Sequence, residues 1–320
     1  MGARIQAPSR TLLGIGLKTG SIFLFTLMLT LGKAYSIYPV AQIVFFRSAF
    51  ALVPLMIWLI ARGDLPRALY TRRLGGHLVR SLAGMGSMFC IFTSYALLPL
   101  ADATALGYAS PLMTSVLAAF VLGERMTPLR WCAVFVGFAG VLVMLLEHLG
   151  EGGGRPPSPT GAMFALAAAF LIAIAMIQTR RLTRTEDTGA ITFYFQFTLT
   201  LVSIVVLLAA AWWPQDWALA WLMGPQAWVM PSPADWAPLI AIGLLGGVGQ
   251  ILMTQGYRYA GASVLATFDY TSLLFAVAIG FLVFGDVPTA MVLVGAGIVI
   301  AAGLAVVWQE SRGGKLRNEP

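Results

Sequence analysis

The residues in this sequence that could best support chemistry are charged side chains that interrupt long apolar stretches. Lys18 lies near the start of one such stretch and Asp269 near the start of another. In helices rising about 1.5 Å per residue, both would sit roughly 10 Å from the same end of their segments. We expect them to form an ion pair across a cavity, with Asp269 in a substrate-binding or gating role. The alternative is that the long side chain of Lys18 extends along its segment and places the ammonium group near the lipid headgroups.

A second candidate pair comes from an internal repeat. Residues 41–47 (AQIVFFR) line up with residues 190–196 (AITFYFQ) at an offset of 149, so that Arg47 matches Gln196. Such matched placement predicts two related gates, or a hydrogen bond between helices that holds the structure together. The sequence leaves both interpretations open.

Other polar side chains could bind a small solute. A zwitterion needs donors for its carboxylate and acceptors for its ammonium group, and hydroxyl and amide groups supply both. Pro111 has no amide hydrogen, so it should bend its helix and free the carbonyl of Gly107, either for an amino group or only as a packing kink. The predicted substrate-binding residues are Tyr95, Tyr108, Pro111, Gln250, Asp269 and Tyr270.

Composition places these residues in a membrane. Hydrophobic residues make up 59% of the 320 residues and charged residues only 10%, against roughly 25% charged in soluble domains. A bilayer core about 30 Å thick requires roughly 20 apolar residues per spanning helix. We therefore predict an all-α integral membrane protein with ten transmembrane helices, at residues 12–32, 39–61, 78–98, 101–122, 128–147, 159–179, 190–211, 236–256, 262–284 and 288–308.

The positive charges predict the orientation of these helices. Lys and Arg collect in cytoplasmic loops of membrane proteins, and here nearly all of them, Arg80 included, fall in the two termini and alternate loops. Only Lys33 and Arg155 fall in the opposite loops. Both termini are thus expected in the cytoplasm. The net charge of +7 reflects this topology, and no nucleic-acid partner is expected because the charges are dispersed among loops.

The chain also contains a duplication. Residues 94–127 repeat 162 positions later, with Tyr95 and Tyr108 returning as Tyr257 and Tyr270. The predicted repeats are residues 1–155 and 156–320, with five helices in each. Because five is odd, the second repeat must enter the membrane from the opposite side, which gives an inverted repeat of the kind common in secondary transporters.

Enzymatic chemistry is not expected. The sequence offers no paired carboxylates on a helix and no Ser/His or Cys/His arrangement for hydrolysis. With two cysteines and two histidines it predicts no metal site, and it contains no phosphate-binding loop or cofactor motif. The expected partners are a small-molecule substrate and the lipid bilayer, while the oligomeric state is left open.

Each half ends in a similar motif. Residues 122–127 read LGERMT and are followed by a helix with Gly137 and Gly140, while residues 284–289 read FGDVPT and are followed by Gly295, Gly297 and Gly303. The chain thereby resembles the EamA type of the drug/metabolite transporter superfamily, with Asp286 in place of the usual Glu. Its overall character is most like that of the YddG-type amino-acid exporters. The resemblance implies that segments 78–98, 101–122, 236–256 and 262–284 face a central cavity, that segments 12–32, 39–61, 159–179 and 190–211 gate it, and that segments 128–147 and 288–308 lie behind.

These observations predict a secondary transporter of the cytoplasmic (inner) membrane. Its expected activity is export of amino acids, aromatic or broad-range, or related small metabolites by alternating access. The alternative within transport is efflux of lipophilic cations or drugs, drawn to the Asp269 carboxylate among aromatic rings. A membrane scaffold with no transport activity is the alternative of a different class.

Overall fold

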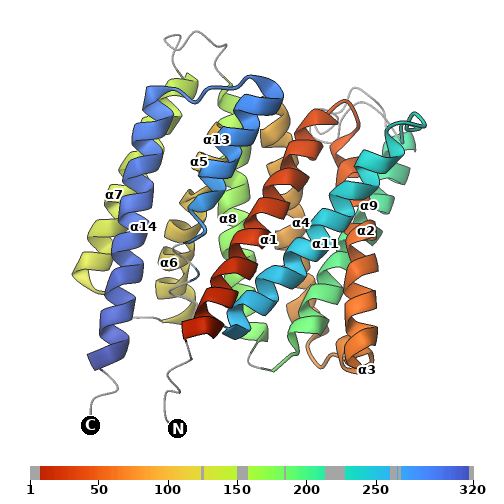
Figure 1. Cartoon of the computed structure of the whole chain (residues 1–320), viewed down its shortest axis with the longest axis horizontal. Coiled ribbons are helices and arrows are strands. Elements are labelled where there is room, and N and C mark those ends of the chain that lie inside the picture. Colours follow the sequence, from red (N-terminus) through yellow and green to blue (C-terminus); the bar gives the residue numbers. More distant parts are fainter. Residues whose placement is uncertain are drawn as a thin grey trace.

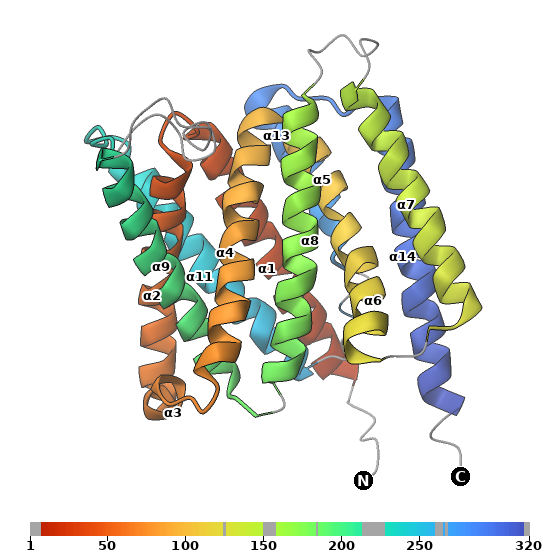
Figure 2. The same cartoon turned by 180° about the vertical axis from the view of Figure 1, so that it is seen from behind.

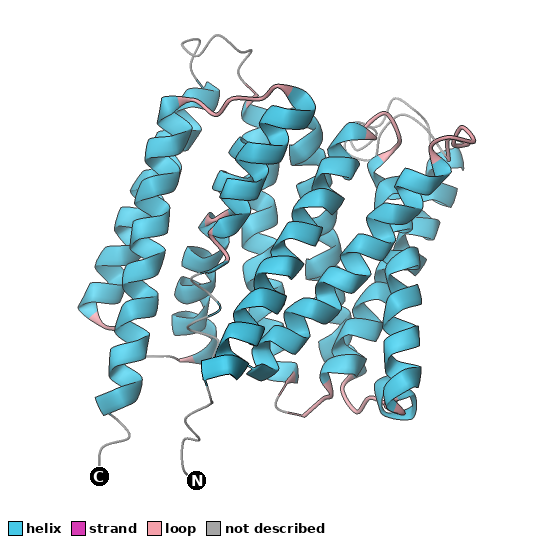
Figure 3. Cartoon of the chain, in the orientation of Figure 1, coloured by secondary structure: helices cyan, strands magenta, loops and turns pink. Residues whose placement is uncertain are grey.

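The chain is described by a computed structural model over residues 8–123, 126–149, 158–183, 185–212, 228–259, 265 and 268–316. Every regular element within these ranges is a helix (Figure 3). The helices are α1 (Pro8–Ala34), α2 (Val40–Arg62), α3 (Leu65–Leu69), α4 (Leu74–Leu97), α5 (Leu100–Gly107), α6 (Ala109–Leu122), α7 (Pro128–Leu149), α8 (Pro159–Leu182), α9 (Thr188–Trp212), α11 (Trp236–Tyr259), α13 (Thr271–Phe284) and α14 (Ala290–Leu316).

Each predicted apolar run overlaps one of these helices, or two where a helix is broken. Among the described residues, six segments are long and apolar enough to cross a membrane: 12–34, 40–62, 100–121, 159–179, 188–209 and 236–256. Three shorter apolar helices cover residues 131–146, 271–284 and 290–305. The chain is therefore a multi-helix membrane protein, while the count of ten spans and the inverted repeat stay predictions.

The helices stand side by side, and their ends define two faces. Helix α1 begins and α14 ends at the lower edge of Figures 1 and 2, which we call the terminal face. Helices α7 and α14 pack along each other at one side of the molecule, and α2 packs against α9 at the other. Helix α4 packs on α8, and α1 packs on α11, between these two edges.

The breaks and ends of two helices follow from particular residues. The run at 101–122 is split at Tyr108 into α5 and α6, as Pro111 predicts, because proline cannot donate the hydrogen bond that a continuous helix requires. Tyr270 occupies the matching position before α13. Gly123 and Gly285 end α6 and α13 with φ angles of 66° and 69°, a left-handed conformation that favours glycine. The adjoining Glu124 and Arg125 of the first motif lie outside the described residues.

Glycine also sets how closely α11 approaches α2. A β-carbon added at Gly243 would lie 2.4 Å from the carbonyl oxygen of Phe46, and one at Gly247 would lie 2.8 Å from that of Ala51. Gly243 and Gly247 thus form the small-residue contact that lets two membrane helices pack backbone to backbone.

This contact makes Gly243→Ala a destabilising change. We expect it to lower the free energy of unfolding by about 1.5 kcal/mol, because the added methyl group overpacks the α2–α11 contact. Denaturation of the purified protein in SDS measures the effect. Gly297→Ala is the matched control, since a β-carbon there meets nothing within 4 Å, and its stability should be unchanged or slightly higher. Equal effects of the two changes would contradict the packing role of Gly243.

Candidate functional site

A cavity of about 980 Å³ lies among α1, α2, α4, α8, α9 and α11. Its lining reaches the terminal face at Arg62, Asp64 and Ala68 on one side and at Thr183 and Asp187 on the other. The described residues of the connections at the opposite face do not line it. The structure therefore shows a solute-sized space that extends to one face only.

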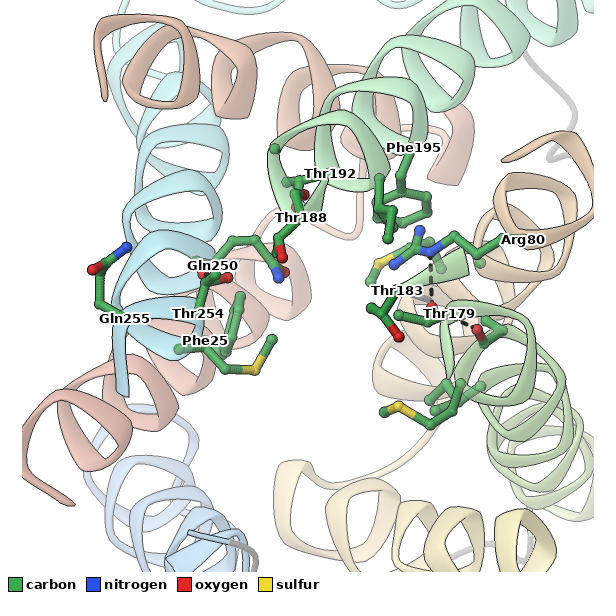
Figure 4. Close-up of a pocket in the computed structure, with 18 of the residues that line it drawn as sticks. Phe25, Arg80, Thr179, Thr183, Thr188, Thr192, Phe195, Gln250, Thr254 and Gln255 are labelled. Atoms are coloured by element: carbon green, nitrogen blue, oxygen red, sulfur yellow. Dashed lines mark hydrogen bonds between the residues drawn. The ribbon is translucent and has the colours of Figure 1, made fainter. Parts of the chain in front are cut away.

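The cavity combines apolar surface with polar groups on facing walls. Phe25, Met28 and Met88 are among the apolar lining residues. Figure 4 shows Arg80, Phe195 and Thr179 on one wall and Gln250 and Thr254 on the other. Mixed surfaces of this kind bind small molecules by burying their apolar parts and orienting their polar ends. Gln250, one of the expected substrate-binding residues, lines this cavity.

Lys18 and Asp269 meet at the wall of the cavity. The Lys18 ammonium lies 2.6 Å from Asp269 Oδ1, and the exposed fractions of the two side chains are 3% and 48%. Lys18 comes from α1, and Asp269 from the turn that precedes α13. Because the lysine is buried and the carboxylate is half in the cavity, the pair joins α1 to the start of α13 while one side of Asp269 faces the cavity.

Arg47 and Gln196 also meet, as their matching places in the repeat suggested. Arg47 Nη1 donates to Gln196 Oε1 at 2.7 Å, and both residues are almost fully buried. Arg47 lines the cavity, whereas Gln196 does not. The amide of Gln196 thus holds the arginine from behind the wall and links α2 to α9.

The three tyrosines, also expected to bind substrate, do not line this cavity. Tyr95 is hydrogen-bonded to Thr104 at 2.9 Å and packs in the core. Tyr108 donates to the Tyr270 carbonyl at 3.2 Å and is hydrogen-bonded to Ser272 at 2.8 Å. The Tyr270 hydroxyl points toward α14, where Gly303 leaves room for it. The hydroxyl groups of Tyr95 and Tyr108 are hydrogen-bonded to neighbouring elements, and all three side chains pack between helices.

The wall of this cavity differs from the expected one in two further respects. Pro111 is exposed and does not line the cavity, so its role in the structure is the break between α5 and α6. The described parts of α5, α6 and α13 contribute no lining residue, whereas α1, α2, α8 and α9, expected only to gate, supply most of the wall. The reason is that α5 packs against α8 and α13, which places the α5–α6 run behind the wall.

Arg80 is the main residue that the sequence analysis did not select. It was grouped with the cytoplasmic loop charges, yet it lies well inside α4 and lines the cavity. Its Nε donates to Thr179 Oγ1 at 3.3 Å, and its guanidinium carbon lies 4.0 Å from the centre of the Phe195 ring (Figure 4). The signal was present, because the predicted run 78–98 already contained this charge, and intramembrane charges are usually functional.

Side chains close the molecule at the face opposite the cavity mouth. Lys33 donates to the Leu98 carbonyl at 2.6 Å and lies 3.3 Å from Asp286. The Gln42 amide exchanges two hydrogen bonds with the backbone of Val229, at 2.8 and 3.0 Å. The contacts of Lys33 with Asp286 and of Gln42 with Val229 join the end of α1 and the start of α2 to segments of the second half.

Tyr38 and Asp235 add a contact at this face that should depend on pH. The Tyr38 hydroxyl donates to Asp235 Oδ2 at 2.6 Å, and this bond holds the pKa of the Asp235 carboxyl below its usual value. A carboxylate with a lowered folded-state pKa contributes stability above its ordinary pKa of about 4, and that contribution is lost as the pH falls through the folded value.

We therefore expect Tyr38→Phe to lower the melting temperature at pH 7 and to have a smaller effect near pH 3. Melting curves of the two proteins at both pH values measure this difference. Because other carboxylates titrate equally in both proteins, the difference between them isolates the contact. An effect of Tyr38→Phe that is the same at both pH values would contradict this account.

Among the described residues, no three His, Cys, Asp or Glu side chains come together as metal ligands. The arrangement of cavity and closed face is instead that of a protein that binds a small solute from one side. Comparison with known proteins is consistent with this conclusion. The chain is 29% identical to the pseudopaline exporter of Pseudomonas aeruginosa over 92% of this chain and 95% of that protein.

Other relatives carry different solutes in different directions. A riboflavin transporter of Brucella anthropi is 30% identical, over 85% of this chain and 89% of that protein. An S-adenosylmethionine uptake transporter of Rickettsia prowazekii is 25% identical, over 87% and 86%. A solved crystal structure shares the fold with a TM-score of 0.64 and 19% identity, covering 95% of this chain and 98% of that one. The model of the EamA-like transporter family matches residues 12–146 and 159–308, and the chain therefore belongs to that family of membrane transporters.

Proposed function

We propose that this transporter exports amino acids or related small metabolites from the cytoplasm by alternating access. The observation that carries the proposal is the cavity of about 980 Å³, which is lined by residues of both halves and extends to one face only. Side-chain contacts such as Lys33 with Asp286 and Gln42 with Val229 join the halves at the other face. Breaking these contacts while closing the mouth would pass a bound solute across the membrane.

The proposed mechanism rests on two inverted repeats, residues 1–155 and 156–320. Several helix pairings support this division. Counted along each repeat, α8 is the counterpart of α1, α9 of α2, and α11 of α4. The pairing of α1 with α11 then corresponds to that of α8 with α4. The pairing of α2 with α11 corresponds in the same way to that of α9 with α4. Structures with matched contacts can exchange the conformations of their halves at little cost.

The terminal face is proposed to lie in the cytoplasm of the cell that carries the protein in its inner membrane. In a background without Cys90 and Cys132, we expect Arg72→Cys to resist an impermeant thiol reagent added to intact cells. Ile37→Cys, at an opposite-face position that is 85% exposed, should react under the same conditions. Labelling at residue 72 but not at residue 37 would reverse the proposed orientation and with it the direction of transport.

An amino acid or similar metabolite fits the cavity better than a lipophilic cation. The cation hypothesis relied on Asp269, whose carboxylate is engaged by the buried Lys18 ammonium. The cavity wall also carries Arg47 and Arg80, which would repel a cation. Gln250, Thr179 and Thr254 offer polar groups for the ends of a zwitterion, and the apolar lining suits a large side chain.

Transport by purified protein in liposomes tests the proposal. Liposomes loaded with unlabelled amino acids should take up radiolabelled amino acids by exchange, and quaternary amines should not compete. Repeating the assay with and without a pH gradient tests proton coupling. Uptake of radiolabelled quaternary amines without uptake of amino acids would support cation efflux, and no exchange of any compound would support a scaffold.

A further inference from the structure

Two arginines share one aromatic ring in the cavity wall. The guanidinium carbon of Arg80 lies 4.0 Å from the centre of the Phe195 ring, and that of Arg47 lies 5.5 Å from the same centre. Both residues line the cavity, one from α4 and one from α2. Two positive groups are therefore held at one place on the wall, within the apolar part of the protein.

Neither arginine has an acidic partner in the described part of the chain. The ion pairs found there involve Lys18, Lys33, Arg62, Arg67 and His77, but neither Arg47 nor Arg80. The buried Nε of Arg47 and the buried Nη1 of Arg80 also have no hydrogen-bond partner among the described residues. Retaining two cations with buried nitrogen atoms near each other is costly unless an anion compensates them.

The contacts that do exist leave the outer part of Arg80 available. Its Nε donates to Thr179 Oγ1, whose own hydrogen is donated to the Ala175 carbonyl at 2.7 Å. Stacking on Phe195 fixes the plane of the guanidinium group. Arg47 is restrained more strongly because its Nη1 is bound to Gln196. Arg80 is thus the arginine whose donors are available to a ligand, and Arg47 contributes a second positive charge close to it.

We propose that this cluster, Arg47, Arg80, Thr179 and Phe195, binds the anionic group of the transported solute. A carboxylate matches the paired donors of a guanidinium group, and a phosphate group presents the same oxygen geometry. The assignment rests on the proposed transport function and narrows it to solutes with a carboxylate or phosphate group. The rest of such a solute would extend toward the Gln250 wall on the far side of the cavity (Figure 4).

The test compares acids with amides of the same shape, in which an uncharged carboxamide replaces the carboxylate. Purified protein in detergent is heated with L-phenylalanine or L-phenylalaninamide, with succinate or succinamide, and with inorganic phosphate. We expect at least one acid to raise the melting temperature more than its amide does, or phosphate to raise it more than chloride at matched ionic strength. Protection by phosphate alone would identify a phosphorylated solute, and protection by the acids a carboxylate.

Variants of the protein distinguish a specific anion-binding site from a general attraction of anions to positive charge. Arg80→Gln should weaken binding of the protecting anion about tenfold or more, as loss of a charge-assisted hydrogen bond predicts, and Arg80→Lys should weaken it less. Arg67→Gln is the matched control, because Arg67 is 77% exposed, has Asp64 as partner and does not line the cavity. Binding that is unchanged in Arg80→Gln, or equally weakened in Arg67→Gln, would overturn the proposal.

The outcome is independent of the test of transport. Should Arg80→Gln prove too unstable to purify, Thr179→Val removes the oxygen that accepts from Arg80 Nε and should weaken anion binding several-fold. Amides that protect as well as their acids, with no effect of phosphate, would overturn the anion site even if exchange occurs in liposomes. Conversely, anion binding that depends on Arg80 in a protein without exchange activity would contradict the transport proposal alone.

Discussion

Replacing Gln196 by leucine should lower the free energy of unfolding by about 3 kcal/mol. Gln196 Oε1 accepts a 2.7 Å hydrogen bond from the Arg47 guanidinium, and both side chains are buried. Leucine has a similar size but no acceptor, so the change leaves a buried charge without that partner. Denaturation in SDS, monitored by the loss of helical signal, measures the difference.

A double-mutant cycle shows whether the loss comes from this hydrogen bond. Arg47→Met with Gln196→Leu removes both polar partners and should recover most of the stability lost by Gln196→Leu alone, because a buried pair is often replaceable by apolar residues of similar size. Additive losses from the two changes would contradict the account. They would mean that Arg47 and Gln196 stabilise the protein through separate contacts.

The second large effect is expected at Asp269. Asp269→Asn keeps the shape of the side chain but removes the charge that lies 2.6 Å from the buried Lys18 ammonium. We expect a loss of about 2 kcal/mol, less than for a fully buried pair because Asp269 is half exposed. Adding Lys18→Met should recover part of this loss, as measured by denaturation in SDS.

The transport assay separates this structural role from proton coupling. If Asp269 carries the coupling proton, Asp269→Asn should abolish uptake driven by a pH gradient while leaving exchange intact. If the ion pair is structural, both activities should fall together and Lys18→Met should restore them in part. Wild-type stability and wild-type activity in both assays would remove Asp269 from the mechanism.

The positions of the helices along the chain were largely predictable from the sequence, because they depend on the length of apolar runs and on a few backbone rules. Pro111 breaks its helix, and Gly123 and Gly285 end theirs with positive φ angles, whatever the neighbouring helices do. The pairing of Lys18 with Asp269 followed from their equal depth. Features of this kind can be predicted from the position of a residue along its helix.

The wall of the cavity was less predictable, because it depends on how each helix is rotated. Tyr95, Tyr108 and Tyr270 were selected because polar groups in a membrane seek partners, but a neighbouring element can satisfy that need as a solute would, as it does for Tyr95 and Tyr108. Sequence alone does not distinguish the two cases. Arg80 shows the converse, since a charge counted with the loops proved to lie on the cavity wall.

The central claim is that the solute passes through the cavity between the two halves. It is tested most directly by attaching a bulky maleimide to Gln250→Cys in a background without Cys90 and Cys132, and then measuring exchange in liposomes. Leu244→Cys is the control, because Leu244 lies on the same helix, is 39% exposed and does not line the cavity. The account predicts that labelling at residue 250 abolishes exchange while labelling at residue 244 leaves it intact. Undiminished exchange with residue 250 fully labelled would contradict it.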